Sequence, residues 1–142
     1  MKITPIICQD FIDIIIPEIN KAEKSIKIIV YDWRWYHTAI GSPAQKFNSA
    51  ILQAHKRGVK IQVITNIKHV IGILASCGIA AKKIITNKTV HSKIMIIDDK
   101  DLVIGSHNYT QNAFTLNFET SVLITDFDQI QRFIDFFNTL YF

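Results

Sequence analysis

The sequence predicts an α/β protein with a mixed, largely parallel β-sheet and helices on both faces. Two observations lead to this fold class. The stretch "SIKIIVYDW" (residues 25–33) is β-branched and almost continuously apolar, as expected of a central strand covered on both faces. Blocks of this kind alternate along the chain with helix-like blocks, and that order favours strands joined by crossover helices.

Four helices are expected, and one of them has a full set of end signals. Ser42 suits the N-cap and Pro43 the first helical position. Gln45 lies three residues after the cap, and Gly58 follows the basic end of the segment. Pro17 argues against a helix in the first segment, because an interior proline costs about 3 kcal/mol. The expected segments are residues 10–24, 42–58, 66–78 and a C-terminal helix starting near Asp126, with Gln129 completing a capping box.

Six strands are expected between these helices. They span residues 25–33, 59–65, 81–86, 92–97, 102–105 and 118–125. The polar sequence "DDKD" separates two of them and is typical of a hairpin turn. The strand at 81–86 is expected at an edge of the sheet.

Length and charge restrict the kind of protein. A chain of 142 residues is the size of one domain, so we expect residues 1–142 to form a single unit. The formal net charge of +4 and the pI near 9.1 favour anionic partners without proving one. Two cysteines are too few for a disulfide framework. Neither a signal peptide nor a membrane-spanning run is recognisable, which predicts a cytoplasmic protein without stable membrane insertion.

Polar side chains gather in the predicted hairpin. Because side chains alternate along a strand, His91 and Lys93 share one face, and Asp98 lies on the other. The hairpin brings Ser106 and Asn108 back beside the first pair. Together these side chains can donate to phosphate oxygens, and an imidazole can attack phosphorus. The pattern therefore indicates an oxyanion site with a nucleophile.

The spacing of these residues resembles the signature of the phospholipase D superfamily, the HKD motif. The match runs through His-x-Lys, an aspartate five residues later and Gly-Ser-x-Asn, and it comprises His91, Lys93, Asp98, Gly105, Ser106 and Asn108. The segments "AILQAHKRGVKIQVIT" and "HSKIMIIDDKDLVIGSHNYT" are similar to the small bacterial phospholipase D-like endonucleases, which carry one motif per chain. The resemblance implies the phospholipase D-like fold. It also implies that Glu119, eleven residues after Asn108, holds the catalytic histidine in its working tautomer.

The roles of several further residues are less well determined by the pattern. Asp98 is either catalytic or structural, because it occupies the opposite strand face and aspartate suits hairpin turns. His107 falls at the variable position of the motif and is expected to be a surface imidazole. Trp33, Arg34 and Trp35 lie in an aromatic and basic segment that can stack on bases, pack at a subunit interface or belong to the core.

The chemistry of the motif predicts a shared site. A single histidine cannot attack phosphorus and protonate the leaving oxygen at the same instant, so one motif per chain implies a homodimer, as the family resemblance also does. His91 is expected to form a phosphohistidine, and the cationic and amide donors take the place of a metal ion, so no cofactor is expected.

Three functions compete. The leading prediction is a metal-independent endonuclease that acts on DNA, with RNA as the other possible nucleic acid. The alternative is a phospholipid phosphodiesterase of the phospholipase D or cardiolipin hydrolase kind, and the third is a nucleic-acid-binding module without catalysis. An intact motif argues against the third, and the sequence does not fix strand or base preference.

Overall fold

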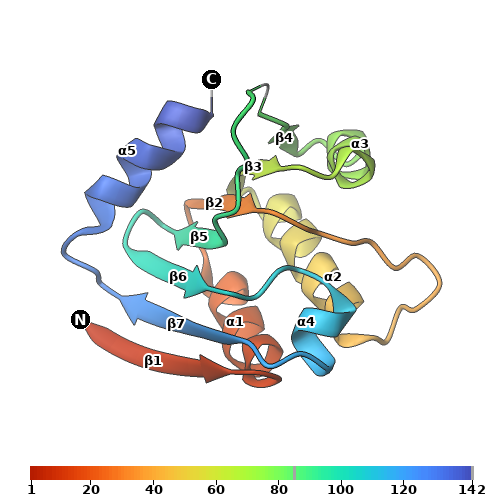
Figure 1. Cartoon of the computed structure of the whole chain (residues 1–142), viewed down its shortest axis with the longest axis horizontal. Helices are drawn as coiled ribbons and strands as arrows, with labels where there is room; N and C mark the ends of the chain where they lie inside the picture. The colour runs from red at the N-terminus through yellow and green to blue at the C-terminus, as the bar shows by residue number, and fades with distance from the viewer. Residues whose placement is uncertain (85, 142) are drawn as a thin grey trace.

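A computed structural model describes residues 1–84 and 86–141, and it contains a seven-stranded sheet in the order β1-β7-β6-β5-β2-β3-β4 (Figure 1). The strands are β1 (Lys2–Ile7), β2 (Ser25–Val30), β3 (Lys60–Thr65), β4 (Ala80–Lys82), β5 (Ile94–Ile97), β6 (Asp101–Gly105) and β7 (Thr120–Thr125). The helices are α1 (Asp10–Lys21), α2 (Pro43–Lys56), α3 (Lys68–Ser76), α4 (Gln111–Thr115) and α5 (Ile130–Leu140).

The α/β class is confirmed, but the sheet is mostly antiparallel, so the expectation of a largely parallel sheet was wrong. Only β2, β3 and β4 are parallel to one another. The pairs β2–β5, β5–β6, β6–β7 and β1–β7 are antiparallel. α2 and α3 carry the chain back between β2, β3 and β4, which makes these strands parallel, whereas a tight turn reverses it between β5 and β6. The antiparallel pairs β1–β7 and β2–β5 join strands that are far apart in the sequence.

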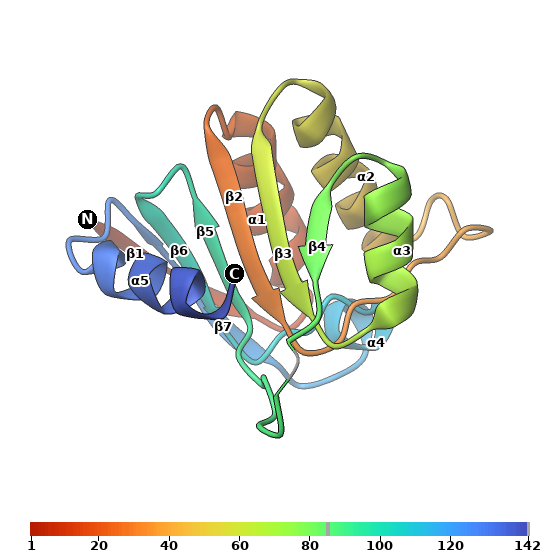
Figure 2. The ribbon, with the colours of Figure 1, turned by 90° about the horizontal axis from the view of Figure 1, so that it is seen from above.

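Helices cover both faces of the sheet, as predicted. α1 and α2 lie on one face and α5 lies on the other (Figure 2). The larger core is on the α1 and α2 side, where Phe11 and Phe47 are buried against Val63 and Met95. The smaller core lies under α5, where Ile134 and Phe137 pack with side chains of β2, β3, β5 and β6.

The end signals of α2 act as the sequence indicated. The side chain of Ser42 accepts a hydrogen bond from the backbone amide of Gln45 at 3.3 Å, and Pro43 opens the helix. Gly58 follows with a φ of +99°, which a residue with a side chain rarely adopts. α1 continues through Pro17, whose ring faces solvent.

Two elements, β1 and α4, were not predicted, and the last helix starts later than expected. β1 was not predicted, because Thr4 and Pro5 interrupt its apolar residues; an edge strand tolerates proline, since one side of its backbone has no partner. The C-terminal helix begins at Ile130, and its N-cap residue Gln129 makes no side-chain capping bond. Asp126 lies instead in a turn with a φ of +50°.

The edge position expected for the third strand is confirmed, although β4 ends at Lys82. The expected strand extended to residue 86, and residue 85 within it lies outside the described residues. Among the helices of the described chain, none has the length and apolar character needed to cross a bilayer.

Candidate active site

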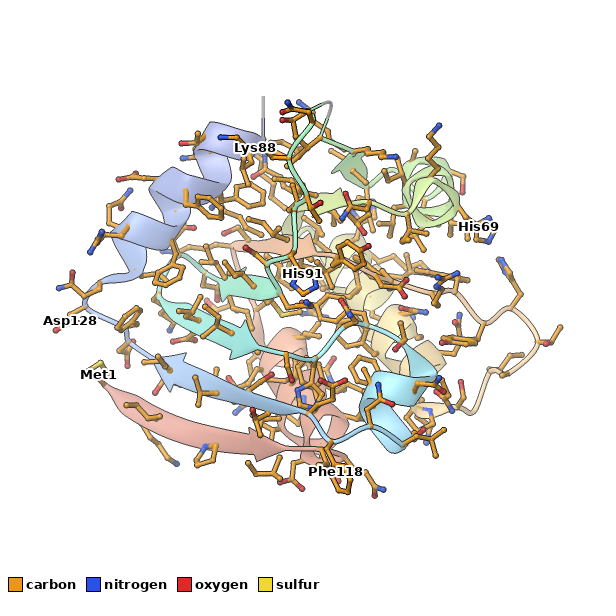
Figure 3. The ribbon with its side chains drawn as sticks, in the orientation of Figure 1. Met1, His69, Lys88, His91, Phe118 and Asp128 are labelled. Atoms are coloured by element: carbon orange, nitrogen blue, oxygen red, sulfur yellow. The ribbon has the colours of Figure 1, made fainter. Side chains whose placement is uncertain are left out.

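All the motif residues except Asp98 lie at one edge of the sheet. The parallel strands β2 and β3 end there, and β5 starts there because it runs antiparallel to β2. His91 and Lys93 precede β5 at this edge, and His91 lies near the middle of the face seen in Figure 3. The Nζ atom of Lys93 is 3.0 Å from Nδ1 of His91, so the two side chains lie together, although the strand expected from residue 92 starts only at Ile94.

The β5–β6 hairpin brings the second half of the motif to the same place. Its register pairs Ile94 with Ile104, which sets Gly105 and Ser106 beside the segment that carries His91. The result is an open pocket of about 360 Å³. Its lining consists of His91, Ser92, Lys93, Ile94, Ile104, Gly105 and Ser106.

Gly105 is required because β6 and β7 approach closely at this point. A Cβ atom at position 105 would lie 2.2 Å from Oγ of Ser121 and 2.4 Å from the carbonyl oxygen of Thr120. The second contact is with backbone, which a rotamer change cannot move away. The motif glycine therefore permits the strand contact that places Ser106.

Ser106 connects the pocket to Glu119. Its hydroxyl donates to Oε1 of Glu119 at 2.6 Å, and its oxygen accepts from the amide of Thr120 at 3.0 Å. Oε2 of Glu119 accepts from Asn117 at 3.1 Å. Among residues 1–84 and 86–141 no hydrogen bond joins Glu119 to His91, so the role in setting the histidine tautomer stays a prediction.

Lys93 is partly withdrawn from solvent. Desolvation lowers the pKa of its ammonium group, and the negative charge of Glu119 raises it only in part. The net effect on the pKa of Lys93 is downward. The ammonium remains available as a donor beside His91.

Asn108 has a fixed orientation. Its Oδ1 atom accepts a hydrogen bond from the backbone amide of Asp32 at 3.0 Å, and an N–H group can only donate, so Oδ1 is the atom on that side. The carbonyl of Asp32 in turn accepts from the amide of Tyr109 at 3.0 Å. The NH₂ group of Asn108 is thereby left to face other acceptors.

Tyr31 belongs to the site and was missed by the sequence reasoning. The ring centroids of Tyr31 and His91 lie 5.0 Å apart, and Nζ of Lys93 lies 5.8 Å from the ring centroid of Tyr31. The available signal was its position one residue after the end of a buried strand, where side chains reach a ligand edge.

Asp98 lies at the other end of β5, five residues beyond Lys93, a separation of roughly 16 Å at about 3.3 Å per residue. Its carboxylate accepts hydrogen bonds from the backbone amides of Glu23, Lys24 and Ser25 at 2.7–3.1 Å. Partial burial alone would raise its pKa, but these bonds and the nearby Lys100 outweigh burial, and the pKa of Asp98 is lowered. The geometry gives Asp98 a structural role in holding the start of β2.

The aromatic segment after β2 corrects one expectation. Trp33 is fully buried, and its indole N–H donates to Oδ1 of Asn48 at 2.6 Å, so it is a core residue and not a substrate contact. Trp35 is half-buried against the same core. Arg34 is exposed but paired with Asp32, Nε to Oδ1 at 2.7 Å.

His107 is a second correction, because it is buried and not a surface imidazole. Its Nε2 donates to the carbonyl of Cys8 at 2.8 Å, and its Nδ1 accepts from the Ser121 hydroxyl at 2.7 Å. Desolvation lowers the pKa of His107, against smaller upward effects of the Cys8 carbonyl and Glu119. The variable position of the motif is therefore a packing position here.

The pocket presents an imidazole, an ammonium and a hydroxyl, and the side-chain amide of Asn108 follows Ser106 by two residues. Groups of this kind suit an anionic, tetrahedral centre such as a phosphodiester, because an imidazole can attack phosphorus and an ammonium or amide group can donate to phosphate oxygens. The single proton of the Ser106 hydroxyl is already donated to Glu119. In the described residues, no three His, Cys, Asp or Glu side chains come close enough to form a metal site. An α/β sheet with this motif at its edge defines the class of phospholipase D-like domains.

The family is shown by direct comparison. The family model described as "Cardiolipin synthase, PLD-like domain" matches residues 15–141. The chain therefore belongs to the family of phospholipase D-like domains.

Curated relatives carry two kinds of name. The chain is 29% identical over 109 residues to the mitochondrial cardiolipin hydrolase of Mus musculus, covering 72% of this chain and 48% of that protein. It is 33% identical over 126 residues to a phospholipase D of Rickettsia prowazekii, covering 84% of this chain and 55% of that one. The chain thus spans about half the length of the curated relatives it matches.

Two solved structures share the fold over nearly their whole length. NucT from Helicobacter pylori has a TM-score of 0.77 at 24% identity, with 98% of this chain and 94% of that chain covered. Nuc from Salmonella typhimurium, a phospholipase D family member, has a TM-score of 0.80 at 21% identity, with 99% and 95% covered.

Proposed function

We propose that this protein is a phosphodiesterase that cleaves nucleic acid, DNA before RNA, without a metal ion. The observation that carries the proposal is the meeting of His91, Lys93 and Ser106 in one pocket, with the NH₂ group of Asn108 held toward other acceptors. The resemblance to small single-motif endonucleases and the basic pI near 9.1 favour nucleic acid as the substrate.

The reaction proceeds in two displacements. In the first, a ring nitrogen of His91 attacks phosphorus, the bond from phosphorus to the leaving oxygen breaks, and the partner's His91 gives that oxygen a proton. In the second, the partner's His91 takes a proton from water, the resulting hydroxide attacks phosphorus, and the phosphorus–nitrogen bond breaks. Lys93 and Asn108 stabilise the charge on the non-bridging oxygens, and Ser106 assists while bonded to Glu119.

The second histidine comes from a second copy of the chain. Beside the catalytic pocket, an apolar groove of about 600 Å³ lies between the sheet and α5, and the two share Ser92, Ile94 and Ile104. Phe136 on the rim of this groove is 42% exposed, and an exposed apolar surface next to an incomplete site suits a twofold contact. Dimerisation over this face would bring two motifs together.

Light scattering tests the dimer. The wild-type protein is expected at about twice 16.3 kDa, and Phe136→Asp at 16.3 kDa with loss of activity. Ile40→Asp is the matched control, because Ile40 is 78% exposed in the loop before α2. A fully active wild-type monomer would overturn the shared site.

The same groove supports a second candidate, a phospholipid phosphodiesterase. Apolar side chains from β5, β6 and α5 line it, including Ile94, Phe133 and Phe136, and such a surface accommodates an acyl chain. The names of the curated relatives point the same way.

One assay separates the candidates. Pure protein is incubated in EDTA with labelled single-stranded DNA, double-stranded DNA, RNA and phospholipid vesicles. Cleavage of DNA that His91→Ala abolishes supports the proposal, cleavage of lipid alone supports the second candidate, and nucleic-acid binding without cleavage leaves a binding module. Loss of all cleavage in EDTA, restored by a divalent metal, would contradict metal independence.

The cytoplasmic location stays a prediction.

A further inference from the structure

One long segment of the chain contains no acidic residue. Between Trp33 and Ile97 there is neither Asp nor Glu, although the chain has twelve such residues. The same segment holds ten of the sixteen Lys and Arg residues and four of the five histidines. The modest net charge of +4 therefore hides a strongly uneven distribution.

This segment folds mainly into one side of the molecule. It comprises α2, β3, α3 and β4, the loop that leads from β4 into the catalytic residues, and the central strand β5. α3 and β4 lie at the end of the sheet remote from β1 (Figures 1 and 2). The cationic half of the chain is thus adjacent to the active site.

Three lysines of this segment lie at the catalytic edge. Lys68 opens α3 just after β3 ends, Lys83 follows β4, and Lys88 lies in the loop that precedes His91. Lys68 and Lys83 line a common pocket of about 570 Å³. All three side chains are exposed, and none of them forms an ion pair with another described residue.

One hydrogen bond holds the segment before α3 against the segment that carries His91. The side-chain amide of Asn66, two residues before Lys68, donates to the carbonyl of Val90 at 2.9 Å. Val90 is the neighbour of His91. Figure 3 shows Lys88 on the side of His91 toward the end of α5, and His69 on the side toward α3.

Other cationic side chains of the segment have partners within the protein or lie away from the catalytic edge. Arg34 is paired with Asp32, and Arg57 donates to the carbonyl groups of Ile19 and Ala22. Lys82 lies 4.5 Å from the ring centroid of Tyr141. Lys56 and Lys60 lie at the opposite edge, where α2 ends and β3 begins.

We infer that Lys68, Lys83 and Lys88 bind successive phosphates of a single-stranded nucleic acid whose scissile phosphodiester lies at His91. We call these three residues the lysine track. This inference rests on the proposed function and assigns the substrate path on one side of the pocket. The segment that carries them has no carboxylate, and none of the three forms an ion pair with a described residue, so they offer cationic groups to a polyanion.

A membrane surface fits the lysine track less well. Basic surfaces that bind bilayers also insert large apolar side chains. In the described chain, the exposed large apolar residues fall before residue 41 or after residue 115, outside the elements that carry the track. Charge without apolar anchors favours nucleic acid.

The test compares two triple variants with the same change in charge. One replaces the track (Lys68→Gln, Lys83→Gln, Lys88→Gln), and the control replaces exposed lysines of the opposite edge (Lys24→Gln, Lys56→Gln, Lys60→Gln). The probe is a fluorescent single-stranded 20-mer of DNA, with KM and Kd measured at several salt concentrations. A small phosphodiester, bis(p-nitrophenyl) phosphate, reports the chemical step without flanking phosphates.

We expect the track variant to raise KM for the 20-mer roughly 10- to 100-fold and to flatten the slope of log Kd against log salt by about 2, at about 0.7 per lost contact. In the control variant, KM for the 20-mer should change less than about twofold. In the track variant, the rate of cleavage of the small diester should likewise change less than about twofold. Equal effects of the two triple variants on the 20-mer would overturn the lysine track while leaving the proposed function intact.

The remaining outcomes separate the two ideas. If the wild-type protein cleaves neither substrate, the proposed function fails, while Kd for the 20-mer still decides whether the track binds nucleic acid. If the track variant loses binding to anionic phospholipid vesicles and keeps its Kd for the 20-mer, the surface is a membrane contact and the inference is wrong.

Discussion

Asn108 is held by the backbone of Asp32: the amide N–H of Asp32 donates to Oδ1 of Asn108 at 3.0 Å. This bond fixes the side chain with its NH₂ group on the side away from the Asp32 amide, where our proposal has it donate to a phosphate oxygen. The end of β2 and the motif segment after β6 thus jointly orient Asn108.

Asn108→Asp tests this arrangement. The aspartate keeps an acceptor for the Asp32 amide but replaces the NH₂ donor with a negatively charged oxygen, so we expect a loss of kcat/KM of roughly 10²–10³-fold. The free energy of unfolding should change by less than about 1 kcal/mol. Asn112→Asp, an exposed position on α4, makes the same charge change and should keep activity. A fully active Asn108→Asp variant would remove Asn108 from the mechanism.

Gly105→Ala is expected to destabilise the protein by about 1–3 kcal/mol or more, because the new methyl group would meet the carbonyl of Thr120 at 2.4 Å. Chemical denaturation measures the change. Gly72→Ala is the matched control with the opposite sign: its Cβ has nothing within 4 Å, and alanine favours the helix interior by up to about 1 kcal/mol. Equal stability of the two variants would show that β6 and β7 can separate.

Asp98→Ala should lower the free energy of unfolding by about 1.5–3 kcal/mol, since three backbone amides lose a charged acceptor. Asp98→Asn should cost less, because asparagine tolerates the φ of +54° and retains one acceptor. Both variants should keep kcat within about tenfold of wild type where they are folded. A large loss of kcat in stable Asp98→Asn would mean that Asp98 acts in catalysis.

Asp98 also predicts a dependence of stability on pH. Its folded-state pKa is lowered, so the native state binds fewer protons than the unfolded chain. This contribution is fully present above the unfolded pKa of about 3.9 and is lost as pH falls through the folded value. The stability difference between wild type and Asp98→Asn should therefore shrink in acid. Asp128→Asn, in an exposed turn, should show no such change.

His107 predicts a second pH effect, at higher pH. Burial lowers its pKa, so the neutral ring is favoured in the native state. The stabilisation is complete above the unfolded pKa of about 6.5 and is lost as pH falls toward the folded value. In denaturation curves from pH 8 to pH 5, His107→Gln should start less stable and lose less stability on acidification than wild type. His37→Gln, at an exposed position, should follow wild type, and parallel curves for His107→Gln would exclude the effect.

Local sequence patterns predicted much of the fold and the centre of the site. The apolar runs at 25–33 and 59–65, together with Ser42, Pro43 and Gly58, located β2, α2 and β3 closely, because these signals act within one element. The meeting of His91, Lys93 and Ser106 followed from their short spacing and one hairpin turn, although the strand itself starts only at Ile94. Geometry of this short range follows directly from the sequence.

Burial and strand direction depended on the tertiary structure. Trp33 and His107 are core residues because Asn48, Cys8 and Ser121, distant in sequence, satisfy their polar atoms; no local pattern shows such partners. The antiparallel half of the sheet and the edge strand β1 depend on which strands pair. The sequence by itself determined the reactive side chains and their spacing. Tertiary packing decided which polar residues are buried and which line the pocket, because that depends on contacts between elements far apart in the chain.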